Sequence, residues 1–350
     1  MANSQLAIRN SPPYLSSTLC RAESKLIDLD VMVFRTIARK FRSIDLVVPS
    51  WLEQAILHRA AVDTTKIHLP LIAIVGPPRV GSTLMYQVLA SQFELFYFDN
   101  FQHTLLRYPY LAYRLSRALL RERVGEFQSD HGYVAGLGGL SEGNFFWPYW
   151  FGMEMTETDP RPDHWRLAHI KRVFNQIHQQ VGRPMVNSFN AHAFYLANLA
   201  EIFDQVVIVN MRRDPTANAL SLLRARRQLC SHEATWWSIQ PRECIDLHHC
   251  PVYTQIASQI IATYRIVQRQ RACNHDLAII DVAYEELCAT PTAVVQRIQD
   301  YCQTHGIQLQ ARTDVTPLPL FATQCREPNQ VDCAKFKELF ANVDWATLWS

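Results

Sequence analysis

The sequence predicts an α/β fold, with a P-loop-like parallel sheet at the centre and helices on both of its faces. Three short apolar runs carry this prediction: residues 69–75, 205–211 and 277–282. Each run is followed by a turn and then by a segment that we expect to be helical. Strands that alternate with helices in this way form a parallel sheet, because each helix crosses back over it. We therefore expect a single domain with helical additions at both ends.

The chain divides into three stretches in this prediction. Residues 1–65 form a helical N-terminal extension, in which five apolar residues recur at three- and four-residue spacing: Leu26, Leu29, Val33, Ile37 and Phe41. Residues 66–316 form the α/β domain, with helices expected at 82–93 and near 291–305. Residues 317–350 are first punctuated by proline and then helical, and we expect them to pack on the same domain.

Composition and charge exclude several classes of protein. The chain has 34 Lys and Arg against 32 Asp and Glu, and this near-zero net charge argues against a dedicated nucleic-acid binder. The longest apolar runs are far shorter than the roughly 20 residues that span a membrane, and no secretory signal is visible. Nine scattered cysteines indicate a reduced compartment. We expect a cytoplasmic protein that binds neither nucleic acid nor membranes, and its oligomeric state stays open.

The most informative segment is the glycine-bracketed turn after the first strand, residues 76–83 (GPPRVGST). Its spacing lets backbone N–H groups converge on an anion at the N-terminus of the next helix. The lysine of nucleotide-binding P-loops is replaced here by Ser82, while a cation, Arg79, lies inside the loop. The segment predicts a phosphate site and argues against ATP or GTP hydrolysis. An ordinary strand-to-helix turn is the alternative.

Residues 78–84 (PRVGSTL) resemble the P-R-S-G-T-T-L loop of bacterial members of the sulfotransferase superfamily, with departures at Val80 and Ser82. In that family the loop binds the 5′-phosphosulfate of the donor 3′-phosphoadenosine 5′-phosphosulfate (PAPS). The resemblance implies donor contacts from six consecutive residues: Arg79, Val80, Gly81, Ser82, Thr83 and Leu84. Arg79 and the helix N-terminus are then placed to stabilise the phosphate that leaves as 3′-phosphoadenosine 5′-phosphate (PAP).

Two further segments resemble motifs of the same family. The second strand is followed by Arg213 and by an Asp-Pro pair that suits the first turn of a helix, with Ser221 eight residues after the arginine. By resemblance, Arg213 and Ser221 hold the 3′-phosphate, and a helix-cap ion pair is the alternative interpretation. Residues 282–291 resemble V-x-Y-E-D-L-x-x-x-P, which implies that Tyr284 lies near the adenine.

Sulfuryl transfer needs a general base within hydrogen-bond reach of the acceptor. Residues 188–203 resemble the family stretch K-S-P-x-H-L-x-x-L-x-x-L-x-x-x-F, so His192 matches the family histidine. The family lysine falls on Ser188, and its positive charge is therefore missing. His192 is a candidate base, and a structural or substrate-contacting role is the alternative.

Three other residues are candidate bases. Residues 129–132 and 139–143 resemble the S-x-H-G and P-S-E-G elements of bacterial members, which makes His131 and Glu142 candidates to act as the base or to orient the acceptor. Burial beside the aromatic residues that follow would raise the pKa of the Glu142 carboxyl, as a base at neutral pH requires. Asp99 lies near the position of an acidic base in related enzymes.

Three weaker signals allow more than one interpretation. Aromatic residues at 145–151, with Trp236 and Trp237, line an acceptor pocket or pack in the core. The Cys and His residues of 244–250 fit no standard zinc module, so we predict no metal. The arginines of 107–123 form a solvated helix face, or a basic face for an anionic acceptor, a partner or nucleic acid.

We therefore expect a bacterial, PAPS-dependent sulfotransferase. Its acceptor would be a hydroxyl or N–H of a soluble small molecule, such as a specialised metabolite. Two other functions stay open. A P-loop kinase or NTPase would bind ATP with magnesium, against which the missing lysine argues. A non-catalytic protein of the same fold would bind the nucleotide without transfer, which the departures at Val80 and Ser188 leave open.

Overall fold

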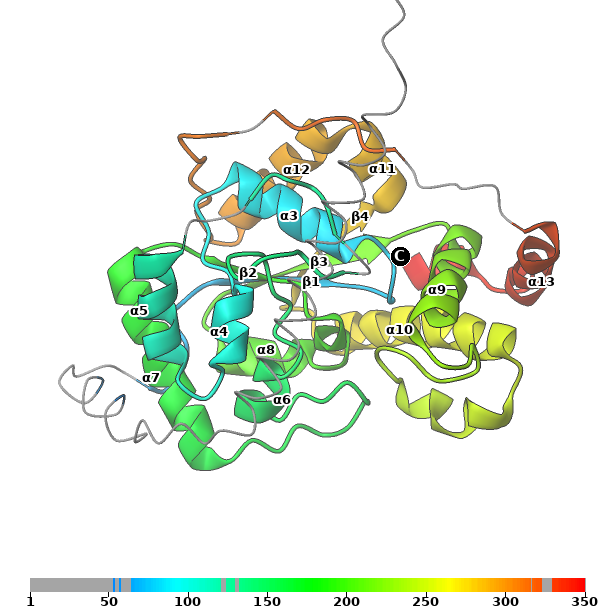
Figure 1. Ribbon diagram of the computed structural model, residues 1–350, viewed down its shortest axis with the longest axis horizontal. Helices are drawn as coiled ribbons and strands as arrows, with labels where there is room; N and C mark the ends of the chain where they lie inside the picture. Colours follow the sequence, from blue (N-terminus) through cyan, green and yellow to red (C-terminus); the bar gives the residue numbers. More distant parts are fainter. Residues whose placement is uncertain are drawn as a thin grey trace, which may run out of the picture. The chain divides into compact units, whose positions relative to one another are not determined.

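Four parallel strands form the central sheet, in the order β2-β1-β3-β4 (Figure 1). They are β1 (Leu71–Val75), β2 (Met185–Asn187), β3 (Val206–Arg212) and β4 (Ala278–Ala283). Leu71 pairs with both Met185 and Val206, and Val207 pairs with Ala278. The predicted α/β fold with a parallel sheet is confirmed, and β1, β3 and β4 correspond to the three expected strands.

The computed structural model describes Glu53, Leu57 and residues 64–120, 124–129, 132–315, 317–322 and 329–349. All of them belong to one unit of the chain, Val48–Ser350. The apolar pattern of residues 26–41 lies outside the described residues. Glu53 and Leu57, in the expected N-terminal extension, are helical. The division of the chain at residues 65 and 316 stays a prediction.

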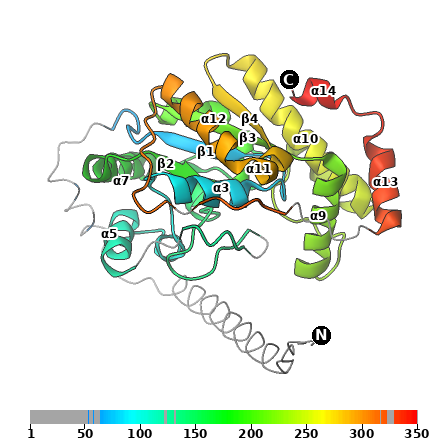
Figure 2. The ribbon, with the colours of Figure 1, turned by 90° about the horizontal axis from the view of Figure 1, so that it is seen from above.

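Helices cover both faces of the sheet, as predicted. α3 (Ser82–Gln92), α11 (Tyr284–Ala289) and α12 (Pro291–Thr304) lie on one face, and α8 (Leu196–Ile202) and α10 (Val252–Cys273) lie on the other (Figure 1). Figure 2 shows the molecule from the side of α3, α11 and α12. The side chains of β1 alternate between two apolar cores, because successive residues of a strand point to opposite faces. Ile72 and Ile74 pack with residues of α3 and α12, whereas Leu71 and Val75 pack in the second core. Every residue of β1 is therefore buried.

The remaining elements surround this sheet. They are α4 (Asn100–Thr104), α5 (Pro109–Leu119), α6 (Phe146–Phe151), α7 (His164–Val181), α9 (Pro215–Leu229), α13 (Gln330–Phe340), α14 (Trp345–Trp349) and the 3₁₀ helices η1 (Asn190–Phe194) and η2 (Arg242–His249). α9 begins as the sequence predicts, because the Asp214 carboxylate accepts a hydrogen bond of 2.7 Å from Ala217 N and Pro215 occupies the first turn.

A third apolar cluster joins the last helices to the rest of the domain. Phe336 and Phe340 of α13 and Trp345 of α14 pack with residues of α9 and α10. Arg227 Nη1 of α9 also donates to Asp332 Oδ2 of α13 at 2.7 Å. The C-terminal helices α13 and α14 therefore pack against α9, the helix that follows β3.

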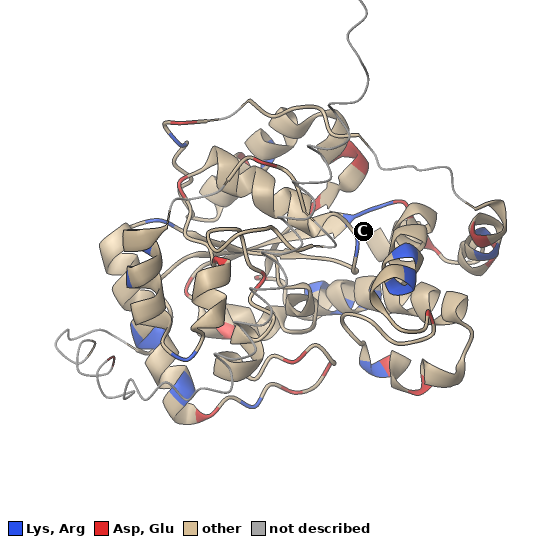
Figure 3. Cartoon of the chain, in the orientation of Figure 1, with Lys and Arg blue, Asp and Glu red and all other residues tan. Residues whose placement is uncertain are grey.

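Three further findings concern charge, hydropathy and possible metal ligands. Basic and acidic residues are interspersed over the elements of the described chain (Figure 3). Among the described residues, no helix combines the length and the apolar character that a membrane crossing requires. The same residues contain no group of three or more His, Cys, Asp and Glu side chains arranged to hold a metal ion.

Candidate active site

In the glycine-bracketed loop between β1 and α3, the backbone packs closely against neighbouring residues at both glycines. A Cβ at Gly76, whose φ is +145°, would lie 2.8 Å from Met211 O, and a Cβ at Gly81, whose φ is +104°, would lie 2.3 Å from the Tyr284 ring. Only glycine fits both positions without a shift of the neighbours. No described side chain caps the N-terminus of α3. The first N–H groups of this helix therefore face the loop mouth, where they favour an anion.

The loop is tied to the end of β3 by hydrogen bonds to its own carbonyl groups. Arg213 Nη1 donates to Arg79 O at 2.8 Å, and Asn218 Nδ2 donates to Pro78 O at 2.7 Å. Arg79 has a φ of +68°, which is rare for a residue with a side chain. These bonds hold the loop in a left-handed turn that the chain would otherwise avoid.

Three predicted residues meet around Arg79. Arg79 Nε donates to Ser221 Oγ at 3.5 Å, and the Arg213 guanidinium lies 4.3 Å from the centre of the Tyr284 ring. Arg213 Nε is buried and has no hydrogen-bond partner among the described residues. The eight-residue interval between Arg213 and Ser221 is not a helical repeat, because the arginine precedes α9 while the serine lies within it. An anion between these side chains would satisfy the buried Nε.

These residues line a cleft of about 440 Å³. Its basic and polar lining includes Arg79, Arg213 and Ser221, and its apolar lining includes Leu84, Phe127 and Phe321. The Phe127 and Phe321 rings meet edge to face, with their centres 5.2 Å apart. Neither phenylalanine has a signal in the sequence, because both come from loops in which no spacing marks them.

The other loop residues divide between the core and the site. Val80 is fully buried in the apolar core, so its side chain does not line the cleft. The Ser82 hydroxyl is buried and donates to Asn190 Oδ1 at 3.3 Å. Thr83 Oγ1 instead donates to Glu142 Oε1 at 3.4 Å. One predicted base, Glu142, therefore lies in contact with the glycine-bracketed loop, residues 76–83, which we call the phosphate loop.

Glu142 is partly buried, and its environment shifts its titration to neutral pH. Burial raises the pKa of this carboxyl to about 7, while the hydrogen bond from Thr83 and the charge of Arg79 act in the opposite direction. A Cβ at Gly132 would lie 3.5 Å from Glu142 Oε1, so this glycine borders the carboxylate closely. His131, the neighbouring candidate, lies outside the described residues.

His192 lies in η1 with no exposed surface. Its ring meets Trp147 at 4.3 Å and Phe189 at 5.2 Å, both edge to face. Neither ring nitrogen has a hydrogen-bond partner among the described residues. Burial lowers the pKa of this imidazole to about 3, so it is neutral at physiological pH. Ser188, at the position of the family lysine, is also fully buried and has no hydrogen-bond partner for its hydroxyl among the same residues.

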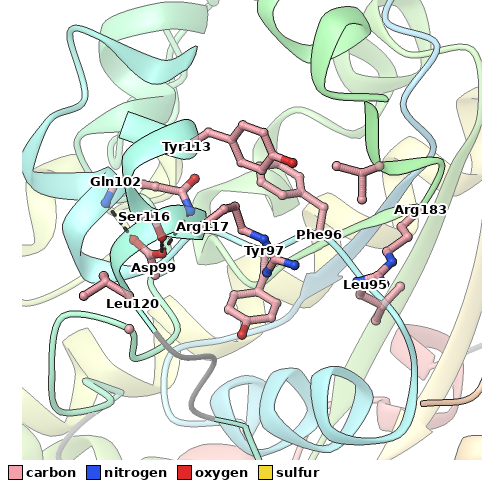
Figure 4. Close-up of a pocket in the computed structure, with 12 residues that line it drawn as sticks. Leu95, Phe96, Tyr97, Asp99, Gln102, Tyr113, Ser116, Arg117, Leu120 and Arg183 are labelled. Atoms are coloured by element: carbon pink, nitrogen blue, oxygen red, sulfur yellow. Dashed lines mark hydrogen bonds between the residues drawn. The ribbon is translucent and has the colours of Figure 1, made fainter. Parts of the chain in front are cut away.

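Asp99 acts as a helix cap in a different pocket. Its carboxylate accepts hydrogen bonds from Gln102 N at 2.7 Å, from the Gln102 side chain at 3.0 Å, and from the Ser116 hydroxyl (Figure 4). Burial raises the pKa of this carboxyl. The pocket in Figure 4 and the cleft have different lining residues. Asp99 therefore does not line the cleft.

The aromatic residues at 145–151 belong largely to the core. Phe146, Trp147, Trp150 and Phe151 are buried, whereas Phe145 is 47% exposed. Trp236, in the loop after α9, lies 5.1 Å from the guanidinium of the buried Arg226. Of the segment 145–151, Phe145 thus has the most surface to offer an acceptor.

In a comparison with models of known protein families, one family matches this chain. A family model described as the sulfotransferase family matches residues 70–306. No curated protein matches the chain.

Several solved structures resemble the chain. Sulfotransferase STF9 from Mycobacterium avium is 16% identical with a TM-score of 0.46, over 85% of this chain and 73% of that one. Sulfotransferase STF1 from Mycobacterium tuberculosis H37Rv is 15% identical with a TM-score of 0.47, over 84% and 80%. The sulfotransferase domain of the Synechococcus PCC 7002 olefin synthase is 17% identical with a TM-score of 0.36, over 79% and 96%.

Proposed function

The chain belongs to the sulfotransferase family, and on that premise we propose that it transfers a sulfuryl group from PAPS to a hydroxyl or N–H of a small molecule. One observation carries the proposal. The phosphate loop, the residues after β3 and Tyr284 all line a single cleft. A bacterial, cytoplasmic enzyme that modifies a soluble specialised metabolite remains the expectation from the sequence.

The donor fits the cleft by charge and shape. The N–H groups at the start of α3 suit the 5′-phosphosulfate, and Thr83 at the loop mouth lies beside Glu142. Arg213 and Ser221 suit the 3′-phosphate, which would give the buried Arg213 Nε an acceptor. We assign the adenine to the aromatic lining, where Phe127 and Phe321 join Tyr284.

In the transfer, the Glu142 carboxylate takes the proton from the acceptor as the acceptor oxygen or nitrogen bonds to sulfur. The bond between sulfur and the bridging phosphate oxygen breaks, and PAP leaves with the negative charge. The α3 N-terminus and Arg79 stabilise this charge, and no metal is required. A carboxyl whose pKa is about 7 is matched to this task at neutral pH. His192 has no exposed surface, so we assign it to packing around Trp147.

Thermal unfolding with PAP tests the donor site. A ligand at a hundredfold excess over its dissociation constant stabilises the folded state by about 2.7 kcal/mol, and we expect Arg213→Ala to abolish this gain. Arg212→Ala is the matched control, because Arg212 is ion-paired with Asp281 and does not line the cleft. Stabilisation by ATP and magnesium alone would instead support a kinase or NTPase.

Transfer of radioactive sulfur from PAPS to a panel of phenols, alcohols and amines tests the reaction. Glu142→Gln should lower turnover by about a hundredfold or more, while His192→Phe, which preserves an aromatic ring among Trp147 and Phe189, should retain it. Loss of turnover in His192→Phe alone would identify His192 as the base. PAP binding without transfer to any acceptor would support a non-catalytic protein.

A further inference from the structure

We propose that Asn187, the last residue of β2, is a positioning residue for Glu142. This inference rests on the proposed function, in which Glu142 is the general base. Asn187 Nδ2 donates to the backbone carbonyl of Glu142 at 3.3 Å. The asparagine therefore acts on the base through its main chain, 45 positions away in sequence.

The contacts of Asn187 make it a rigid anchor. Its side chain has no exposed surface. Its Oδ1 accepts hydrogen bonds from Trp147 Nε1 at 3.0 Å and from Phe189 N at 3.1 Å. These two acceptor contacts fix the rotation of the amide, so that Nδ2 points at Glu142. Removing the donor alone should leave both acceptor contacts in place.

The segment around Glu142 is held on both sides as well. The Tyr86 hydroxyl donates to Ser141 O at 3.3 Å, and Gly143 N donates to Ser141 Oγ at 3.3 Å. Burial raises the pKa of the Tyr86 hydroxyl well above its ordinary value, which keeps it a donor. Among these contacts, the bond from Asn187 is the one made to the main chain of Glu142 itself.

Asn187 also ties the base to the phosphate loop. It pairs in register with Ala73 of β1, and β1 leads directly into the loop. The loop that would hold the donor phosphosulfate and the residue that holds the base therefore lie on two adjacent, hydrogen-bonded strands. A displacement of about 1 Å between reacting groups costs on the order of a hundredfold in rate, so this shared frame has a catalytic consequence.

The test compares Asn187→Asp with Trp147→Phe. The ionised aspartate retains an acceptor for Trp147 and Phe189 but has no donor for Glu142. The phenylalanine removes the indole donor from the same amide, together with part of the buried ring, and leaves the donor to Glu142 in place. The measured quantity is PAP formed from PAPS, with water or the best acceptor of the panel, per PAP-binding site. Counting sites in this way corrects for any misfolded fraction, and Asn187→Ala serves if the aspartate variant does not fold.

We expect Asn187→Asp to lower turnover by about tenfold to a hundredfold with unchanged PAP affinity, and Trp147→Phe to lower the unfolding temperature without this loss of turnover. In the Glu142→Gln background, Asn187→Asp should cause no further loss, because it acts through the missing carboxylate. Two results would overturn the role of Asn187 and leave the proposed function standing. One is normal turnover in Asn187→Asp. The other is an equal loss of turnover when Asn187→Asp is introduced into the parent protein and into Glu142→Gln. Full turnover in Glu142→Gln would overturn the assignment of the base, and with it the inference.

Discussion

Glu142 shows how one carboxyl acquires a neutral pKa without a neighbouring carboxylate. Desolvation raises its pKa to about 7 even though Thr83 donates a hydrogen bond to it and Arg79 lies near enough to lower it. Thr83 and Arg79 both belong to the phosphate loop, so the loop and the base are electrostatically linked, and a hydrogen bond with Asn144 also lowers the pKa. The same burial that suits the carboxyl to catalysis penalises its charged form in the folded state.

This penalty predicts that Glu142→Gln stabilises the protein at alkaline pH. The folded pKa of about 7 exceeds the ordinary 4.5, so the folded state binds more protons than the unfolded state between these values, and stability falls as pH rises through them. At pH 8 we expect the glutamine variant to gain about 1–3 kcal/mol, discounted for partial exposure, with no such gain at pH 4. Urea unfolding at both pH values measures it.

Glu94→Gln is the matched control for this prediction. Glu94 is ion-paired with Arg183 at 2.6 Å, so its loss should not stabilise the protein at pH 8. If Glu142→Gln were no more stable than the parent at pH 8, burial would not be raising the pKa of this carboxyl.

At the scale of elements, the phosphate loop contains a stored backbone strain. Arg79 has a φ of +68°, and a left-handed conformation costs a residue with a Cβ about 1 kcal/mol more than glycine. Arg79→Gly and Arg79→Ala both remove the guanidinium and should weaken PAP binding alike. The glycine variant should unfold at a higher denaturant concentration than the alanine variant. Equal midpoints, or a more stable alanine variant, would show that the loop relaxes when the side chain is lost.

The sequence predicted the elements unevenly, for identifiable reasons. β3 and β4 appeared within a residue of their bounds, because each is a run of apolar and β-branched side chains. β1 begins at Leu71 and not at Leu69, since Pro70 has no N–H for the ladder. β2 was missed because three residues are too few for a recognisable run. Its extended form depends on pairing with β1.

The candidate site was predictable where a contiguous motif describes it, and not where the fold assembles it. Arg79, Arg213, Ser221 and Tyr284 came from motifs and do line one cleft. His192 also came from a motif, but its complete burial follows from aromatic packing that no local pattern encodes. Asn187 had no sequence signal, because its partner Glu142 is distant along the chain.

At the scale of the whole molecule, an ion pair fastens the C-terminal helices to the helix that carries Ser221. Asp332 of α13 accepts from Arg227 Nη1 at 2.7 Å and from the Tyr253 hydroxyl at 2.6 Å. The hydrogen bond from Arg227 holds the pKa of Asp332 below its usual value. The stabilisation is therefore present above the unfolded pKa and is lost as pH falls through the folded one.

Asp332→Asn should consequently destabilise the protein at pH 7 by about 1–2 kcal/mol. This value is discounted for solvent screening of the ion pair, because the Arg227 side chain is 41% exposed. The difference from the parent should shrink as the pH falls below the folded pKa of Asp332. Glu233→Gln is the control, because this second partner of Arg227 is 38% exposed and its loss should matter less. An equal effect of the two substitutions would contradict a special role for the contact with α13.

The strand order has a consequence for how the chain is made. Leu71 of β1 pairs with Met185, 114 positions later, and with Val206, 135 positions later. At about 5–20 residues per second, an emerging chain holds this wholly apolar strand without a partner for on the order of ten seconds. Slow closure of distant parallel pairs exposes such a segment to aggregation. Chaperones that shield apolar segments during synthesis should therefore raise the yield of folded protein.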